Sequence, residues 1–380
     1  MRVLFLNFEY PPIGGGGANA TRNILNEFKN FADLKVDLIT SGTDQSDCII
    51  KLSNNIFIHR LSINKKNLHY WTNFEIITSI YRSYFYTRQI LTKHHYDLIH
   101  TFFTIPGGIV SLPFSKKIPV IISIRGTDVP GFNPRYSWLY PFIKPLVRYI
   151  WRHAKMVISN SEGLRDLAHK TFSSGQIIII PNGVYPIIKD ISERNISFTP
   201  PYKFLTVARL IRRKNIHILI ESLARCLNDG LEFHLDVIGD GDQKKWLEAQ
   251  TINLGLGDYI TFHGYIEHDG ISEYYKNADI FILPSMNEGM SNTVLEAIGA
   301  GLPLIVSNTG GTRELVDNNG IVVDDITPEH IYDAIKRITS SKNTLIAYSR
   351  SSLKKASKFT WQNVAKGYIR CYNDALVSHH

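Results

Sequence analysis

Residues 287–299 read NEGMSNTVLEAIG, and they follow the apolar run ADIFIL at 278–283 and the pair Pro284-Ser285. The apolar run is typical of a buried parallel strand, and a glycine at position 289 allows a sharp turn. Ser291, Asn292 and Thr293 are residue types that open helices, and the apolar residues after them supply one helix face. The stretch therefore predicts a strand, a loop and a helix N-terminus. Such an N-terminus presents unpaired N–H groups to an anion such as phosphate.

Two carboxylates flank this predicted helix N-terminus, Glu288 in the loop and Glu296 inside the helix. Because carboxylates repel phosphate, residues facing a ligand here would accept hydrogen bonds from sugar hydroxyls. Structural roles are the alternative: Thr293 and Glu296 fit the capping box S/T-x-x-E, and Glu288 fits a solvated loop acid.

The second half of the chain alternates strands with helices. Strands are predicted at 204–208, 233–238, 260–262, 280–283 and 304–306, and this pattern indicates a parallel sheet covered by helices. Arg209 and Lys214 come just after the first of these strands. Together they fit one diphosphate, since arginine forks onto phosphate oxygens and lysine adds a point charge. A solvated basic loop is the alternative, because Arg212 and Arg213 share the cluster.

The first half shows the same alternation. Strands are predicted at 2–8, 36–40, 56–61, 96–101, 120–124, 156–159 and 177–180. A turn with four glycines, Gly14–Gly17, precedes a helix predicted at 21–30, and such a turn permits close approach of an anion. It lacks the G-x-G-x-x-G form, which disfavours a dehydrogenase. Arg125 and Asp128 follow the strand at 120–124, where Arg125 fits a phosphate and Asp128 fits a hydroxyl, an orienting contact to Arg125, or a turn.

Length and composition favour a two-domain globular protein. The chain has 380 residues, 44% of them hydrophobic and 20% charged. Residues 185–202 are polar and proline-bearing, as expected of an interdomain linker. The three cysteines are far apart, which favours a reducing cytosol over a disulfide framework. The N-terminus reads as a first strand rather than a signal peptide, and no apolar run approaches the ~20 residues of a membrane span.

The positive charge is concentrated in the first half. Residues 1–190 hold 22 Lys and Arg against 12 Asp and Glu, whereas residues 191–380 hold 20 against 22. Between about 60 and 96, aromatic residues alternate with cations that include Lys65, Lys66, Arg82 and Arg88. This mixture suits an anionic membrane interface. Aromatic core helices and RNA binding are the alternatives, although no nucleic-acid motif accompanies the segment.

The ordered set of motifs resembles the family-four retaining glycosyltransferases of the GT-B fold. The resemblance covers nearly the whole chain. It rests on the glycine turn, Arg125-Gly126-Thr127-Asp128, Pro181-Asn182-Gly183-Val184, Arg209 with Lys214, Gly239-Asp240-Gly241, Phe262-His263-Gly264, Glu288 with Glu296, and Phe359-Thr360-Trp361. Two positions depart from the family pattern. Arg125 stands where the family often has His, and Tyr185 replaces a usual acid.

The resemblance implies an α/β chain with two Rossmann-like domains that face each other across a cleft. Residues 1–185 would bind the acceptor, residues 200–358 would bind a nucleotide-sugar, and a final helix at about 360–380 would pack back on the first domain. The implied catalytic residues are Arg209 and Lys214, which hold the diphosphate, and Glu288, which contacts the transferred sugar. The implied donor contacts are Glu296, Gly289, Met290, Ser291, Asn292, Gly239, Gly264 and Tyr265. Gly16, Gly17, Arg125 and Asp128 would lie on the phosphate and acceptor side.

The implied activity is the transfer of a hexosyl group with retention of the anomeric configuration, without a metal or a cofactor. Uridine is the expected base of the nucleotide-sugar. The expected acceptor is a saccharide, lipid-linked because the first half is basic and aromatic, in polysaccharide or glycan assembly. The expected location is cytoplasmic, at the inner face of the membrane. A nucleotide-sugar epimerase on the same fold and a non-catalytic sugar-nucleotide-binding subunit are the alternative functions.

Overall fold

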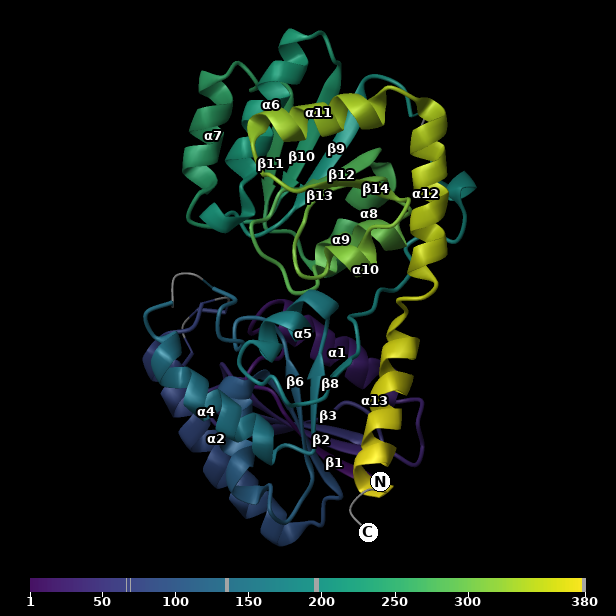
Figure 1. Ribbon diagram of the computed structural model, residues 1–380. Coiled ribbons are helices and arrows are strands. Elements are labelled where there is room, and N and C mark those ends of the chain that lie inside the picture. The colour runs from purple at the N-terminus through teal and green to yellow at the C-terminus, as the bar shows by residue number, and fades with distance from the viewer. Residues whose placement is uncertain (66, 69, 134–136, 195–197, 378–380) are drawn as a thin grey trace. The chain divides into compact units, whose positions relative to one another are not determined.

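A computed structural model describes residues 1–65, 67–68, 70–133, 137–194 and 198–377 (Figure 1). Lys66, which belongs to the basic and aromatic segment, lies outside the described residues. The chain divides into two compact units. Unit 1 contains Met1–Asn182 together with the segment that begins at Trp361, and unit 2 contains Gly183–Thr360. Unit 1 is therefore built from both ends of the sequence.

Unit 1 is organised around one sheet, which has eight strands within the described residues, in the order β3-β4-β2-β1-β5-β6-β7-β8. All pairs are parallel except β3 with β4. The strands are β1 (Arg2–Leu6), β2 (Lys35–Gly42), β3 (Cys48–Lys51), β4 (Ile56–Ser62), β5 (Leu98–Phe102), β6 (Val120–Ile124), β7 (Met156–Ser159) and β8 (Ile177–Ile179). The central strands are buried on both faces, which explains their continuous apolar runs.

Helices cover both faces of the unit 1 sheet. One hydrophobic cluster joins Val3, Phe5 and Leu38 to α1 and α13, and another joins Leu4, Leu6 and Ile39 to α2, α3, α4 and α5. Alternate strand residues therefore face opposite layers. The helical elements are α1 (Gly16–Phe28), α2 (Asn73–Lys93), η1 (Phe103–Gly108), α3 (Ile109–Ser111), η2 (Leu112–Phe114), α4 (Tyr140–His153), α5 (Glu162–His169) and α13 (Trp361–Val377).

Unit 2 has an all-parallel sheet of six strands within the described residues, in the order β11-β10-β9-β12-β13-β14. The strands are β9 (Tyr202–Val207), β10 (Phe233–Ile238), β11 (Ile260–Gly264), β12 (Ile280–Leu283), β13 (Leu304–Ser307) and β14 (Gly320–Val323). The helical elements are η4 (Ile191–Glu193), η5 (Arg212–Lys214), α6 (Ile216–Asn228), α7 (Lys244–Asn253), α8 (His268–Asn277), α9 (Asn292–Gly299), α10 (Thr312–Leu315), α11 (Pro328–Thr339) and α12 (Lys342–Ala356). Helices α6, α7 and α11 pack on one face, and α8, α9 and α10 pack on the other.

The structure corrects three local predictions. Helix α1 begins at Gly16 rather than at residue 21, because the glycines give the first turn room beside the Phe103 ring. The antiparallel β3 and the edge strand β14 were not predicted, since both are short, partly exposed and lack a long apolar run. The segment after residue 185 is not a free linker: Arg194 is buried, and its guanidinium donates to the Gly301 carbonyl at 2.7 Å.

The described helices include none that combines the length and the apolar character needed to cross a bilayer.

Candidate functional site

The topology of unit 2 singles out the gap between β9 and β12. Strands β9, β10 and β11 follow one another toward one sheet edge, and β12, β13 and β14 toward the other, so the strand order reverses between β9 and β12. In open parallel sheets, ligands bind beyond the carboxyl ends of the strands at such a reversal. Arg209 and Lys214 follow β9, and Glu288 follows β12. All three predicted catalytic residues therefore lie on the loops at the reversal.

Lys214 and Glu288 form an ion pair across this reversal. The Lys214 ammonium donates to the Glu288 carboxylate, and both side chains are largely buried. Hydrogen bonds hold the two loops together: Asn215 Nδ2 donates to the Pro284 carbonyl at 3.1 Å, and the Met286 amide donates to the Arg213 carbonyl at 2.9 Å. The pair is thus fixed by loop contacts on both sides.

The ion pair sets the protonation of Glu288. Burial opposes ionisation of this carboxyl, but the charge of Lys214 and its hydrogen bond outweigh burial and hold the pKa below its usual value. Glu288 is therefore a carboxylate at neutral pH. It is not the solvated loop acid that the sequence left open.

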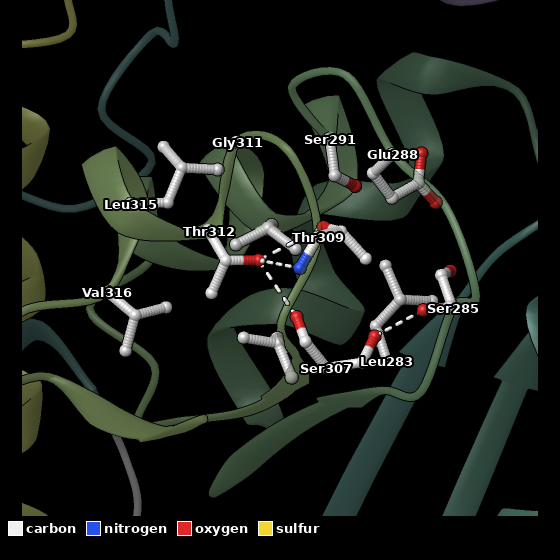
Figure 2. A pocket seen from close by; sticks show the side chains of 12 residues that line it. Leu283, Ser285, Glu288, Ser291, Ser307, Thr309, Gly311, Thr312, Leu315 and Val316 are labelled. Atoms are coloured by element: carbon white, nitrogen blue, oxygen red, sulfur yellow. Dashed lines mark hydrogen bonds between the residues drawn. The ribbon is translucent and has the colours of Figure 1, made fainter. Parts of the chain in front are cut away.

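The loop that carries Glu288 leads directly into α9. Figure 2 shows Glu288 and Ser291 on this loop, beside the segment that runs from Ser307, the last residue of β13, to Thr312; residues of both segments line a narrow pocket. Ser291 is the N-cap of α9, which confirms the predicted helix start. A Cβ at Gly311 would lie 2.4 Å from the Gly289 carbonyl oxygen, so the two loops touch backbone to backbone. This contact holds the predicted donor residues Gly289, Met290 and Ser291 in place.

Glu296 has a different partner from the one that a capping box requires. Thr293 lies inside α9 rather than at its N-cap, so the capping-box interpretation is wrong. Tyr275 of α8 donates to Glu296 Oε2 at 2.9 Å and also contacts the Thr293 carbonyl at 3.2 Å. Burial raises the pKa of Glu296 to about 7, and the Tyr275 hydrogen bond opposes this rise. Glu296 does not line the pocket of Figure 2, although it lies on α9, whose first residues border that pocket.

The remaining predicted donor residues lie at the carboxyl ends of β10 and β11. The Gly239 amide donates to the Gly264 carbonyl at 2.8 Å, and exposed Tyr265 comes next. Gly239 has φ +132°, and a Cβ there would lie 1.9 Å from the Ala208 carbonyl oxygen. Only glycine fits that approach. Since all strands are parallel, these residues share the sheet edge with Arg209 and Glu288. Asn292 is the first residue of α9, on the same edge.

Unit 1 reverses its strand order between β1 and β5. The glycine turn follows β1, and Phe103 follows β5 with the unusual φ of +65°. A Cβ at Gly17 would lie 2.8 Å from the Phe103 ring, and one at Gly14 would lie 2.8 Å from a Glu9 carboxylate oxygen. The predicted phosphate-side residues Gly16 and Gly17 form the first turn of α1 at this reversal, beside an aromatic ring and a carboxylate.

Arg125 and Asp128 are committed to contacts inside unit 1. Asp128 accepts from the amides of Arg125 at 2.9 Å, Gly126 at 3.0 Å and Thr104 at 2.7 Å. It therefore shapes the turn after β6, which is one of the roles that the sequence left open. The Arg125 guanidinium lies 4.1 Å over the Phe102 ring, and its buried Nη2 has no hydrogen-bond partner among the described residues. A phosphate contact from Arg125 stays a prediction.

Sequence reasoning missed four residues of these sites: Glu9, Phe103, Tyr275 and Gly311. Tyr275 lies in a helix pattern typical of core, and Gly311 contacts its partner loop only in the folded sheet. The pair Glu9-Tyr10, which begins three residues past the end of β1, was a usable signal for a polar group near the strand end. Among the described residues, no group of three or more His, Cys, Asp and Glu side chains is arranged to hold a metal ion.

Two largely parallel sheets, each with helices on both faces and a polar site at its reversal, define the GT-B glycosyltransferase class of fold. Solved structures agree. Sucrose-phosphate synthase from Thermosynechococcus elongatus superposes with a TM-score of 0.86 at 20% identity, over 100% of both chains. Anabaena Alr3699/HepE in complex with UDP-glucose superposes with a TM-score of 0.70 at 19% identity, over 98% of this chain and 100% of the other.

Sequence comparison gives the family. Residues 14–186 match the model "Glycosyltransferase Family 4", and residues 188–358 match "Glycosyl transferases group 1". The chain is 26% identical to an uncharacterized glycosyltransferase of Methanocaldococcus jannaschii, MJ1607, over 99% of both proteins. The chain belongs to the family-four glycosyltransferases, and the predicted fold class and family are confirmed.

Proposed function

We propose that the protein is a retaining hexosyltransferase that moves a sugar from a UDP-sugar to a hydroxyl group of a saccharide acceptor. The observation that carries the proposal is the Lys214–Glu288 ion pair at the strand reversal, beside the N-terminus of α9. A lysine ammonium has three N–H donors. One is used by Glu288, which leaves two for phosphate oxygens of a donor. The ion pair would therefore place a cation that binds phosphate, Lys214, next to a carboxylate that binds sugar hydroxyls, Glu288.

The reaction follows from charge development. Cleavage of the bond between the anomeric carbon and the β-phosphate oxygen leaves both electrons on the diphosphate. Arg209, Lys214 and the α9 N-terminus stabilise that charge, which is why we infer that no metal is required. The acceptor oxygen forms its bond to the anomeric carbon on the face that the phosphate leaves. The acceptor proton passes to the leaving phosphate oxygen, so the configuration is retained without a protein nucleophile.

The donor pocket is proposed to follow the sheet edge. Glu296 accepts from the ribose hydroxyls, Gly289, Met290, Ser291 and Asn292 border the sugar, and Gly239, Gly264 and Tyr265 border the base. Uridine is preferred because the Anabaena protein of the same fold binds UDP-glucose. The lone pairs of Glu288 that face away from Lys214 accept from the sugar.

The acceptor is proposed to be a lipid-linked saccharide used in cell-surface polysaccharide or glycan assembly. It would bind to unit 1 near Gly16 and Gly17, and Arg125 and Asp128 would support the neighbouring loop after β6. This proposal rests on the net charge of residues 1–190, which hold 22 cationic and 12 anionic side chains. It places the enzyme at the cytoplasmic face of the membrane.

Thermal shift with a panel of nucleotide-sugars, in the presence of a chelator, tests the donor. A ligand that binds only the folded state raises the melting temperature with its concentration. We expect a shift with one UDP-sugar that is lost in Arg209→Ala and kept in Arg212→Ala, the matched cation of the same loop. A shift with NAD alone would overturn the proposal.

Product analysis separates the alternatives. Release of epimerised donor without an acceptor would identify an epimerase. Donor binding with no turnover on any acceptor, unchanged by Glu288→Ala, would identify a binding subunit. A covalent sugar adduct on Glu288 in mass spectrometry would replace the front-face mechanism by a double displacement.

A further inference from the structure

Helix α2 exposes a stripe of large apolar side chains. Phe74, Ile77, Tyr81 and Phe85 are exposed, and Phe74 is 78% accessible. Successive members are three or four residues apart, so they share one side of the helix, opposite the buried Ser79, Thr87 and Ile90. An amphipathic helix normally turns its apolar side to the core. Here a second apolar side faces outward, and it requires a partner.

Helix α4 repeats this arrangement. Trp138, just before the helix, is 70% exposed and Phe142 is 75% exposed; Leu146 and Tyr149 continue the stripe at helical spacing. The opposite side packs through the buried Val147, Ile150 and Trp151. Sequence reasoning had assigned the interfacial segment to residues 60–96 alone, so the contribution of α4 comes from the structure.

Both stripes belong to the same layer of unit 1. Helices α2 and α4 each contact η1, and the inner sides of both contribute to one hydrophobic cluster with Leu4, Leu6 and Ile39 of the sheet. The other face of the sheet is covered by α1 and α13. We call the exposed residues of the α2 and α4 stripes the docking face: Phe74, Ile77, Tyr81, Phe85, Trp138, Phe142, Leu146 and Tyr149.

The charges of the two helices indicate which partner fits. Helix α4 carries Lys144, Arg148 and Arg152 and no carboxylate in its sequence. In α2 the sole carboxylate of residues 73–93, Glu75, is paired with Lys65 at 3.1 Å. Arg82 of α2 is itself paired with Asp47 at 2.8 Å. Exposed aromatic rings combined with the cations of α4 fit the headgroup region of an anionic bilayer, where rings lie at headgroup depth and cations meet lipid phosphates. An acidic protein would match the cations but not the large aromatic area.

The segment just before the docking face contacts the predicted acceptor loop. The Gly14 amide of the glycine turn donates to the Leu68 carbonyl at 2.8 Å. Leu68 and Tyr70 are themselves exposed and precede Phe74. An acceptor saccharide at the glycine turn would therefore have an apolar, bilayer-facing surface next to it for its lipid.

We propose that α2 and α4 together dock unit 1 on an anionic lipid bilayer, with Phe74, Ile77, Trp138 and Phe142 as the inserted anchors. The proposal rests on the proposed function only in its choice of a lipid-linked acceptor. Binding to vesicles needs neither donor nor acceptor, so it can be measured independently.

Flotation of the full chain with vesicles tests this proposal. The vesicles contain phosphatidylcholine alone or phosphatidylcholine mixed with phosphatidylglycerol. We expect binding to the mixed vesicles that weakens with salt, and a loss of about tenfold or more in Phe74→Ser/Phe142→Ser. Arg148→Gln/Arg152→Gln should weaken binding and flatten its salt dependence. The matched control is Trp246→Ser/Ile252→Ser, which removes two exposed apolar residues of α7, one of them 71% accessible.

The outcomes are distinguishable. The docking proposal is overturned if the wild type does not bind vesicles, or if the wild type and Phe74→Ser/Phe142→Ser bind them equally. Equal losses in the α7 control overturn it too, because binding would then be non-specific. Sedimentation without lipid covers one more case: if wild type self-associates and Phe74→Ser/Phe142→Ser does not, the partner is a second copy and the bilayer proposal falls. A donor-induced thermal shift, measured on every variant, reports on the proposed function and on folding separately.

Discussion

The loops at the strand reversals of the two units are held in place by different kinds of contact. In unit 2, an ion pair and two backbone-to-backbone contacts, Gly239 on Ala208 and Gly311 on Gly289, fix the loops. In unit 1, an aromatic cluster adjoins the glycine turn through Phe103, next to Gly17. Within this cluster Phe8 lies 4.6 Å from Trp71 and 5.2 Å from Phe103, measured between ring centroids. Lys65 lies 4.0 Å over the Trp71 ring.

This difference separates two kinds of recognition. Buried charge held by rigid backbone is committed to one ligand chemistry, because reorganising it costs free energy. Rings can rotate and offer flat apolar faces, so they adapt to ligands of varied shape. Under the proposed function, the rigid charged site of unit 2 would recognise the donor, and the more adaptable aromatic site of unit 1 would recognise the acceptor.

The largest effect is expected from a substitution that removes the ion pair of unit 2. Lys214→Ala should lower kcat by about 10³-fold, because a cation at the leaving group is lost and Glu288 is left as a buried, unpaired carboxylate. Steady-state assays with the identified donor measure this loss, and Arg212→Ala, an exposed cation two residues away, is the control. Similar activity in Lys214→Ala and Arg212→Ala would show that the ion pair is structural.

A pH series tests the buried carboxylate of α9. The pKa of Glu296 is raised in the folded protein from 4.5 to about 7, so the folded state binds this proton more tightly. The associated stability is complete below pH ~4.5 and is lost as pH rises through 7, which amounts to about 3 kcal/mol. Urea unfolding between pH 5 and 8 measures it. The slope should be shallower in Glu296→Gln, and parallel profiles would contradict the prediction.

A pair of glycine substitutions compares the rigidity of the two reversals. Gly239→Ala should destabilise by about 2 kcal/mol or more, because its Cβ would meet a carbonyl oxygen and its φ of +132° is strained for alanine. Gly17→Ala meets the edge of the Phe103 ring, which can move, so we expect a cost below about 1 kcal/mol. Gly257→Ala, with no atom within 4 Å of the new Cβ, is the control. Equal costs at Gly239 and Gly17 would refute the contrast in rigidity.

The sequence predicted the fold, and it predicted that the candidate loops share one sheet edge, because both depend on local patterns. Apolar runs mark the central strands, and polar residues placed just after β9 and β12 point to the carboxyl edge. Parallel pairing then brings Lys214 and Glu288 together, although they are 74 residues apart. The predicted start of α9 was also correct, since a serine N-cap is a local signal.

Features that depend on tertiary contact could not be predicted. The bond from Tyr275 to Glu296, the approach of Gly311 to Gly289, and the positive φ of Phe103 depend on loops that meet only in the folded sheet. Similarly, the outward side of α4 reads as core in the sequence, because its aromatic residues recur at helical spacing. Exposure distinguishes the two, and exposure is a property of the whole unit.

The composition of unit 1 from two distant segments has a consequence for biosynthesis. The buried imidazole of His100 shares a hydrogen bond of 2.7 Å with the Tyr372 hydroxyl, 272 residues later in the chain. During translation, residues 1–182 emerge first but lack α13, whose Trp361, Tyr368 and Tyr372 fill one side of their core. Unit 2, which is continuous in sequence, can complete its core while unit 1 still exposes the groove for α13. A nascent chain that has emerged from the ribosome to about residue 360 is therefore expected to hold a folded second unit and an unfinished first one, open to chaperones until α13 has emerged as well.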